Sequence, residues 1–123
     1  MSFKFNKKEK LKSKKTIERL FREGKAITHH PLKMYYLSID DGQECRFKTA
    51  VSVPKKNFKS AVHRNRIKRL MRESYRLNKH LIFNNIEGNF AFLILYLGKE
   101  MPLYREIEDS LQGVFQKLVN KKR

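Results

Sequence analysis

The chain has few of the residues that would place it in a membrane or an oxidising compartment. Cys45 is the single cysteine in 123 residues, so no internal disulfide can form, which suits a reducing cytosol. No apolar run approaches the ~18 residues of a transmembrane helix. Residues 1–8 carry cations with no apolar stretch behind them, so we expect no secretory signal. These absences predict a cytoplasmic protein without a membrane partner.

Acidic residues are also scarce. The chain has 12 Asp and Glu against 29 Lys and Arg, for a formal net charge of +17, which would be self-repulsive without a strongly negative partner. The excess is concentrated in two windows: residues 1–25 hold ten basic and three acidic side chains, and residues 55–79 hold ten and one. Charge gathered in this way indicates a binding surface for a polyanion.

A protein-borne catalytic site is hard to assemble from this sequence. There is no Gly-rich phosphate loop, nucleophile elbow or HExxH motif. Asp40, Asp41 and Glu44 fit turn chemistry far better than metal binding, and the histidines have no Cys or His at metal spacing. We interpret Cys45 as structural. We therefore predict no catalytic and no metal-ligating residues in the protein.

The length of the chain predicts one domain, residues 1–123, and the order of its elements predicts an α+β fold. Residues 1–15 are rich in cations and are expected to form a flexible basic arm. Thr16 is the expected N-cap of a first helix that ends at Gly24, and His29 and His30 are expected in a loop. The further elements, in chain order, are a strand over 32–39, a strand over 46–53 paired with it, a helix over about 61–77, a central strand over 90–97 and a helix over 104–119.

The helix predicted over 61–77 has two contrasting faces. At about 100° per residue, one face is suited to a core and carries Ile67, Leu70, Met71, Ser74 and Tyr75. The opposite face is polar and cationic, with Asn65, Lys68, Arg69, Arg72 and Arg76. Glu73 is the sole acid in residues 55–79, whereas a solvated helix would normally intersperse acids for i,i+4 pairing. Because guanidinium groups bind phosphates bidentately, this face favours a phosphate backbone.

Two aromatic residues, Phe21 and Tyr35, are open to two interpretations. Both can be core residues, as we expect for Ile17. If one sheet face is left partly uncovered beside the basic helix, Phe21 and Tyr35 could instead form a platform on which unpaired bases stack. The residues alone leave both interpretations open.

The basic helix carries a recognisable pattern, Arg64-Asn65-Arg66-x-Lys68-Arg69-x-x-Arg72-Glu73, which resembles the RNR motif of the bacterial ribonuclease P protein subunit. The resemblance covers most of the chain. Its other elements are a basic arm ending in Leu11, the helix end over 20–24, the strand exit over 52–56, Ala61-Val62 before the motif and a terminal helix.

The resemblance implies a function in tRNA maturation. A catalytic RNA with bound Mg²⁺ removes the 5′ leader of precursor tRNA, and the protein binds this RNA, with a 1:1 ratio expected. The family's contacts to the catalytic RNA fall on Arg64, Asn65, Arg66, Lys68, Arg69 and Arg72. The family's cleft for the single-stranded leader falls on Ile17, Phe21, Tyr35, Ser52, Lys55 and Lys56.

The implied fold is a two-layer α-β sandwich with a central, mostly antiparallel sheet and three helices, shared with a domain of a small-subunit ribosomal protein. Its βαβ crossover through the RNR helix is left-handed, against the general rule. Two features depart from the family. Ile17 stands where an aromatic residue is usual, and the lead-in over 57–60 is one residue longer.

Two other functions remain as alternatives at this point. A small ribosomal protein would be equally basic and equally bound to RNA, and composition does not separate it from a ribonuclease P subunit. A protein-only nuclease would cleave precursor tRNA without an RNA subunit and would depend on Asp40, Asp41 or Glu44.

Overall fold

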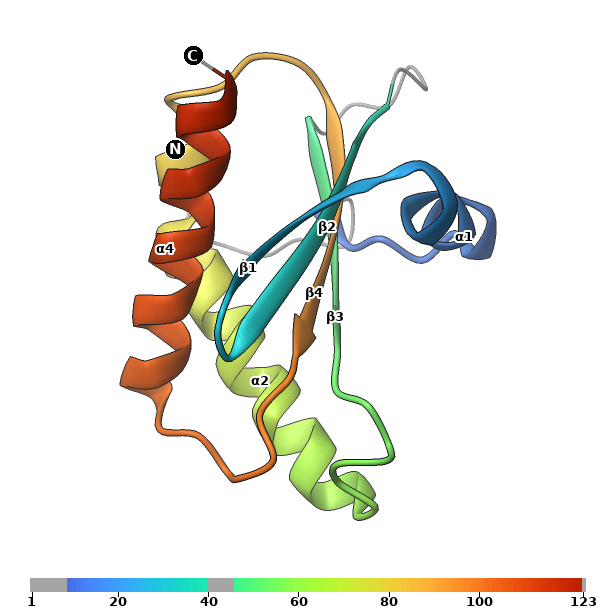
Figure 1. Cartoon of the computed structure of the whole chain (residues 1–123), viewed down its shortest axis with the longest axis vertical. Coiled ribbons are helices and arrows are strands. Elements are labelled where there is room, and N and C mark those ends of the chain that lie inside the picture. Colours follow the sequence, from blue (N-terminus) through green and yellow to red (C-terminus); the bar gives the residue numbers. More distant parts are fainter. Residues whose placement is uncertain (1–8, 40–45, 123) are drawn as a thin grey trace.

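The computed structural model describes residues 9–39 and 46–122 (Figure 1). Its elements are α1 (Lys14–Glu23), β1 (Lys25–His29), β2 (Leu32–Ser38), β3 (Phe47–Ser52), α2 (Ala61–Asn78), α3 (His80–Phe83), β4 (Phe90–Tyr96) and α4 (Tyr104–Lys122). The strands form a four-stranded sheet in the order β1-β2-β4-β3. The long helices α2 and α4 cover one face of the sheet, and α1 lies on the other (Figure 1). The predicted α+β class is confirmed.

The larger core lies between the sheet and the pair of long helices. Strand β4, which was predicted to be central, is buried on both faces over most of its length and pairs with β2 and β3. Aromatic rings fill much of this core: Phe47 contacts Phe83, Phe90 and Phe92 with centroids 4.5, 6.2 and 5.5 Å apart. A smaller cluster on the opposite face lies under α1 and consists of Leu11, Leu20, Ile39, Ala91 and Leu93.

The pairing predicted for β3 was wrong. We expected this strand to pair with β2, but it runs parallel to β4 at the edge of the sheet, with Phe47 opposite Phe90 and Ser52 opposite Leu95. The chain between them forms α2, which makes a parallel connection possible. Because β4 is the most apolar strand, the central place between β2 and β3 buries it best.

Two short elements were missed. Residues 25–29 form β1, antiparallel to β2, so His29 belongs to a strand rather than to a loop. Only Ile27 of β1 is buried, and a single inward residue gives no alternation signal. The four-residue helix α3, which follows α2 almost directly, is a further helix beyond the three predicted.

The first helix begins earlier than predicted. Ser13, not Thr16, is the N-cap: the backbone N–H of Thr16 donates to Ser13 Oγ at 3.3 Å. Lys14 and Lys15 are therefore helical. Residues 9–11, also assigned to the flexible arm, lie against the sheet, and Leu11 is buried. The rest of the predicted arm, residues 1–8, and the predicted turn with Asp40, Asp41, Glu44 and Cys45 lie outside the described residues.

Candidate nucleic-acid interface

The two faces of α2 are separated as the spacing predicted. Ile67, Met71 and Tyr75 are fully buried against the core, and the helix is capped by Ser60, which accepts from His63 N at 3.4 Å. On the exposed side of the helix Asn65, Arg66, Arg69 and Arg72 are accessible to solvent, while Arg64 and Lys68, at the edge of the buried face, are half-buried. Within the described ranges, none of Arg66, Arg69 and Arg72 forms an ion pair. Their charges are thus available to an external anion.

Arg64 has a structural role that the sequence did not reveal. Its Nη1 donates to the carbonyl oxygens of Phe58 at 2.7 Å and Lys59 at 2.9 Å. These bonds fix the connection that enters α2, including the one-residue-longer lead-in. Part of the guanidinium is therefore committed to the protein's own backbone, and its predicted contact with RNA stays a prediction.

The cationic face ends at an ion pair between Arg76 and Glu73. Arg76 Nε donates to Glu73 Oε2 at 3.2 Å, and this hydrogen bond lowers the pKa of the Glu73 carboxyl. Glu73 therefore stays ionised and offsets the charge of Arg76. The net positive charge of the helix is concentrated over residues 64–72, the region of the motif.

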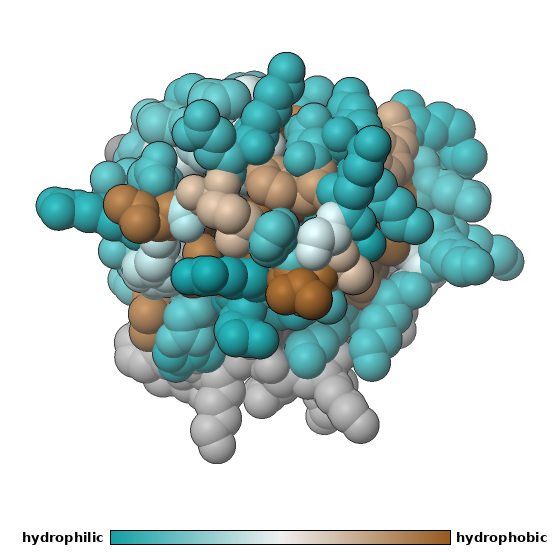
Figure 2. Space-filling view, turned by 90° about the horizontal axis from the view of Figure 1, so that it is seen from below, coloured by the Kyte–Doolittle hydropathy of each residue, from teal (hydrophilic) through white to brown (hydrophobic). Residues whose placement is uncertain are grey.

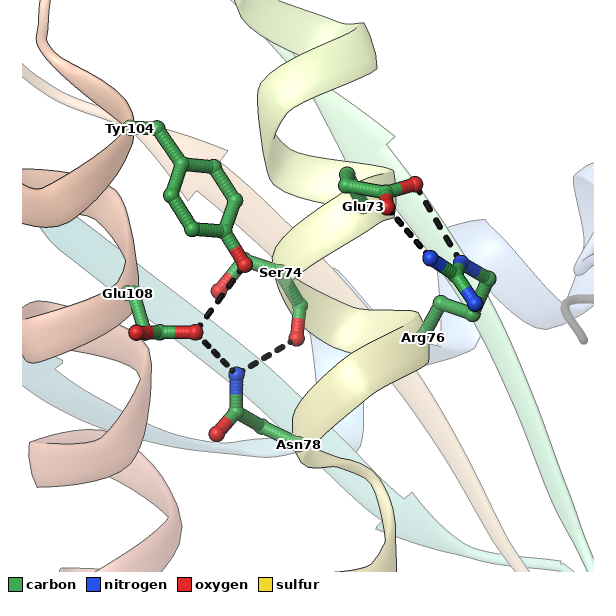
Figure 3. A network of polar contacts seen from close by, with 6 residues as sticks. All are labelled: Glu73, Ser74, Arg76, Asn78, Tyr104 and Glu108. Atoms are coloured by element: carbon green, nitrogen blue, oxygen red, sulfur yellow. Dashed lines mark hydrogen bonds and ion pairs between the residues drawn. The ribbon is translucent and has the colours of Figure 1, made fainter. Parts of the chain in front are cut away.

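A polar network fixes α2 to α4 (Figure 3). Asn78 Nδ2 donates to the carbonyl oxygen of Ser74 at 2.8 Å and to Glu108 Oε2 at 3.1 Å, and the Tyr104 hydroxyl donates to the same Glu108 oxygen at 3.0 Å. Burial and the contact with Glu108 raise the pKa of Tyr104 to about 12, so its hydroxyl remains a donor near neutral pH. Through these bonds the basic face is held on a rigid support.

The sheet face under α1 is a second candidate surface. Register places Tyr35, Leu93 and Ala50 in one row across β2, β4 and β3, and Lys33, Leu95 and Ser52 in the next. Neighbouring strands are about 4.8 Å apart, so the backbones of Tyr35 and Ala50, in the same row, lie about 10 Å apart across this face. The apolar centre of these rows forms the smaller core cluster, in which Ile17 and Tyr35 are partly buried.

Phe21 and Tyr35 form an exposed aromatic pair at the edge of α1. Their ring centroids are 5.0 Å apart in an edge-to-face arrangement, and the Phe21 side chain is 53% exposed. The ammonium of Lys33 lies 5.0 Å from the centre of the Tyr35 ring. An aromatic pair with a cation beside it is suited to stacking on a base while binding its phosphate.

The structure brings four of the six predicted cleft residues, Ile17, Phe21, Tyr35 and Ser52, to this one sheet face. Lys55 and Lys56 lie in an exposed turn just beyond the end of β3. Lys33 was not among the predicted cleft residues, although the alternation of residues 33, 35 and 37 in a strand places it on the same face as Tyr35.

The end of the molecule where α2 and α4 begin has an apolar centre. Figure 2 views this end and shows apolar side chains gathered in the middle and surrounded by hydrophilic ones. Val62 and Leu103, which lie at the starts of the two helices, are 75% and 71% exposed. The basic face of α2 thus begins beside exposed apolar side chains.

Two further properties concern metals and membranes. Across residues 9–39 and 46–122, no three His, Cys, Asp or Glu side chains are grouped so that they could hold a metal ion. None of the helices in the same ranges combines the length and hydropathy needed to cross a bilayer.

A rigid basic helix and an exposed aromatic pair with a cation next to it are features of small RNA-binding proteins. Comparison with known proteins specifies the kind. The ribonuclease P family model matches residues 5–119. The ribonuclease P protein component of Porphyromonas gingivalis is 38% identical over 116 residues, which cover 90% of this chain and 83% of that protein. That of Dictyoglomus thermophilum is 41% identical over 117 residues, covering 94% and 92%. The chain belongs to the ribonuclease P protein family.

Solved structures agree on the fold. The RNase P protein of Staphylococcus aureus superposes with a TM-score of 0.73 at 22% identity, covering 89% of this chain and 94% of that one. The protein from Thermotoga maritima gives a TM-score of 0.71 at 20% identity, covering 89% and 96%.

Proposed function

We propose that the chain is the protein subunit of ribonuclease P, an endoribonuclease of tRNA maturation whose catalytic centre lies in its RNA subunit. In this proposal the exposed face of α2 binds the catalytic RNA. The sheet face under α1 holds the single-stranded 5′ leader of precursor tRNA. Family membership favours this role over that of a ribosomal protein.

The observation that carries the RNA-binding assignment is the exposure of Asn65, Arg66, Arg69 and Arg72 on one side of a helix whose other side is buried. A helix rises 1.5 Å per residue, so cations three residues apart on one face are spaced about 4.5 Å along the axis. Such a rigid array favours a structured phosphate backbone, and Lys68 and Arg64 border it.

The leader assignment rests on the Phe21–Tyr35 pair. Single-stranded RNA is bound mainly by stacking on aromatic rings beside a positive groove. Lys33 supplies the neighbouring charge on the same sheet face, and Lys55 and Lys56 extend it beyond the end of β3. Ile17 contributes apolar contact in place of the family's aromatic residue.

We further propose that Mg²⁺ is bound mainly by the RNA subunit, that the protein binds this RNA with a 1:1 ratio, and that both act in the cytoplasm. The protein's own residues then bind and orient RNA instead of performing the hydrolysis.

Reconstitution tests the proposal directly. The full chain is mixed with a bacterial ribonuclease P RNA at a Mg²⁺ concentration too low for the RNA alone to cleave precursor tRNA. We expect the mixture to cleave at the 5′ end of the mature tRNA. No restored cleavage would contradict the subunit role, and cleavage by the protein without added RNA would support a protein-only nuclease. Co-purification of ribosomal RNA in place of a ribonuclease P RNA would favour a ribosomal protein.

Changing Tyr35 to Ala tests the leader surface. Loss of one stacked base should cost about 1–3 kcal/mol, which corresponds to roughly 5- to 150-fold weaker binding of precursor tRNA. Binding of mature tRNA by the same reconstituted complex should hardly change, because mature tRNA has no leader. Tyr35→Phe is the matched control, since it keeps the ring and should bind both substrates like the unmodified protein. Equal losses for precursor and mature tRNA would refute the leader assignment.

A further inference from the structure

The N-terminal segment over residues 9–12 extends the edge of the sheet. Strand β3 is an edge strand, and Lys10 pairs with its residue Thr49 in a parallel bridge. The backbone N–H of Leu11 donates to the carbonyl oxygen of Thr49 at 3.0 Å, and the Leu11 side chain is buried in the smaller core cluster. Alternation along this extended segment leaves Lys10 and Lys12 exposed on either side of Leu11.

A buried ion pair holds the start of this segment. Lys79 Nζ lies 2.6 Å from Glu9 Oε1, and the two side chains are only 3% and 9% exposed. Lys79 is the C-cap residue that follows α2, so the pair joins the segment to the end of the helix that carries the motif. Burying two charges has a large desolvation cost, and removing one partner leaves the other uncompensated. The pair therefore specifies where residue 9 lies.

Two hollows meet where the segment passes α2, and Lys10 and Arg72 line both of them. The first hollow lies over the edge of β3 at Thr49, with Lys12 on its rim. The second runs along α2 past Asn65 and Arg69, and its lining includes the ion-paired residues Glu73 and Arg76. The cationic face of α2 thus continues across the segment toward the edge of the sheet.

We propose that Lys10, Lys12 and Arg72 form a binding site for a phosphodiester group of RNA, and that the Glu9–Lys79 pair positions it. This inference rests on the proposed function, because the ligand is RNA bound by the assembled subunit. The site joins the surface on α2 to the sheet face under α1. The positive charge of residues 1–25 and that of residues 55–79 then act on one RNA strand.

The site predicts a result for Glu9→Gln that is opposite to simple electrostatics. Removing an acid makes the protein more positive, so charge alone would strengthen RNA binding. If Glu9 positions the segment, the same change releases Lys10 and Lys12 and weakens binding. Lys79 is buried and so does not contact the RNA directly. The effect of Glu9→Gln on binding therefore reports the position of the segment.

The first experiment uses the double variant Lys10→Gln/Lys12→Gln in the full chain. Both side chains are exposed, so the fold should be retained. Binding of ribonuclease P RNA is measured from 50 to 200 mM salt. Two lost contacts reduce the log–log slope by about two, so the variant should lose roughly tenfold less affinity over this range than the unmodified protein. Lys99→Gln/Lys121→Gln, with the same change in charge at exposed positions elsewhere, should keep the original slope.

The second experiment measures Glu9→Gln and the double variant Glu9→Met/Lys79→Met by the same titration, after thermal unfolding has shown that each is folded. We expect Glu9→Gln to bind more weakly with a reduced slope, and the double variant to bind like the unmodified protein because an apolar pair keeps the segment in place. Glu9→Gln binding as tightly as the unmodified protein, or more tightly, would overturn the positioning role.

The source of the phosphate follows from a comparison of substrates. A loss confined to the ribonuclease P RNA assigns the phosphate to that RNA, and a loss seen only for precursor over mature tRNA assigns it to the leader. For Lys10→Gln/Lys12→Gln, an unchanged salt slope both with ribonuclease P RNA and with precursor tRNA would overturn the site. Failure of the unmodified protein to bind either RNA would instead refute the proposed function, so the two failures are distinguishable.

Discussion

A triple variant in which glutamine replaces Arg66, Arg69 and Arg72 should lose about three phosphate contacts in the RNA complex. The log–log salt slope then falls by about three, so the affinity lost between 50 and 200 mM salt shrinks roughly 40-fold relative to the unmodified protein. The physical reason is the release of fewer counterions, since these three guanidinium groups are exposed on one side of α2 and form no ion pair among the described residues. Titration of ribonuclease P RNA at several salt concentrations measures the slope.

A matched control separates this surface from total charge. Lys99, Arg105 and Lys121 are exposed and lie outside the two basic windows, and changing all three to glutamine alters the net charge equally. The slope should stay near its original value in this variant. If both triple variants lowered the slope alike, RNA binding would depend on overall charge, and α2 would not be the specific surface. Thermal unfolding of both variants should match the unmodified protein, because all six side chains are exposed.

The second large effect concerns stability. Phe47→Ala should lower the free energy of unfolding by about 3–5 kcal/mol, because it removes a fully buried ring and leaves a cavity. Phe47 touches three other rings, and the Arg46 guanidinium lies 4.9 Å from its centroid. For a chain of this size the loss corresponds to a midpoint roughly 10–25 °C lower in thermal unfolding.

Phe21→Ala is the control for that measurement. The Phe21 ring is about half exposed and contacts Tyr35 at the surface, so its removal should cost less than about 1 kcal/mol. The two variants therefore separate an aromatic residue that stabilises the fold from one that is available to a ligand. A large stability loss in Phe21→Ala would show that this ring belongs to the core, and the leader surface would then lose its aromatic pair.

The basic helix was predictable because its information is local. The 3.6-residue period fixes which side chains share a face, and the buried set Ile67, Met71 and Tyr75 follows from it. The contacts of Arg64 with Phe58 and Lys59 were not predictable, since they depend on the path of the preceding connection. The same holds for the Glu9–Lys79 pair, whose partners are 70 residues apart in the sequence.

Strand pairing shows the same limit. Alternation located the residues of β3 correctly to within one position at each end, but alternation carries no information about the neighbouring strand. The partner was decided by the burial of β4, which requires strands on both sides, and by α2, which is long enough to return the chain in parallel. Part of the candidate cleft, the row that joins Tyr35 to Ala50 through Leu93, exists only because of that pairing.

The anchoring of residues 9–11 has a consequence for the order of events during synthesis. These residues are made before Thr49 and Lys79, the two residues that hold them in place. Contacts between distant parts of a chain form late in folding, because a long loop must close before they yield any stabilisation. The N-terminal segment should therefore be the last part of the RNA-binding surface to reach its place. Newly made chains would pass through a state in which α2 is complete while Lys10 and Lys12 are still free to move.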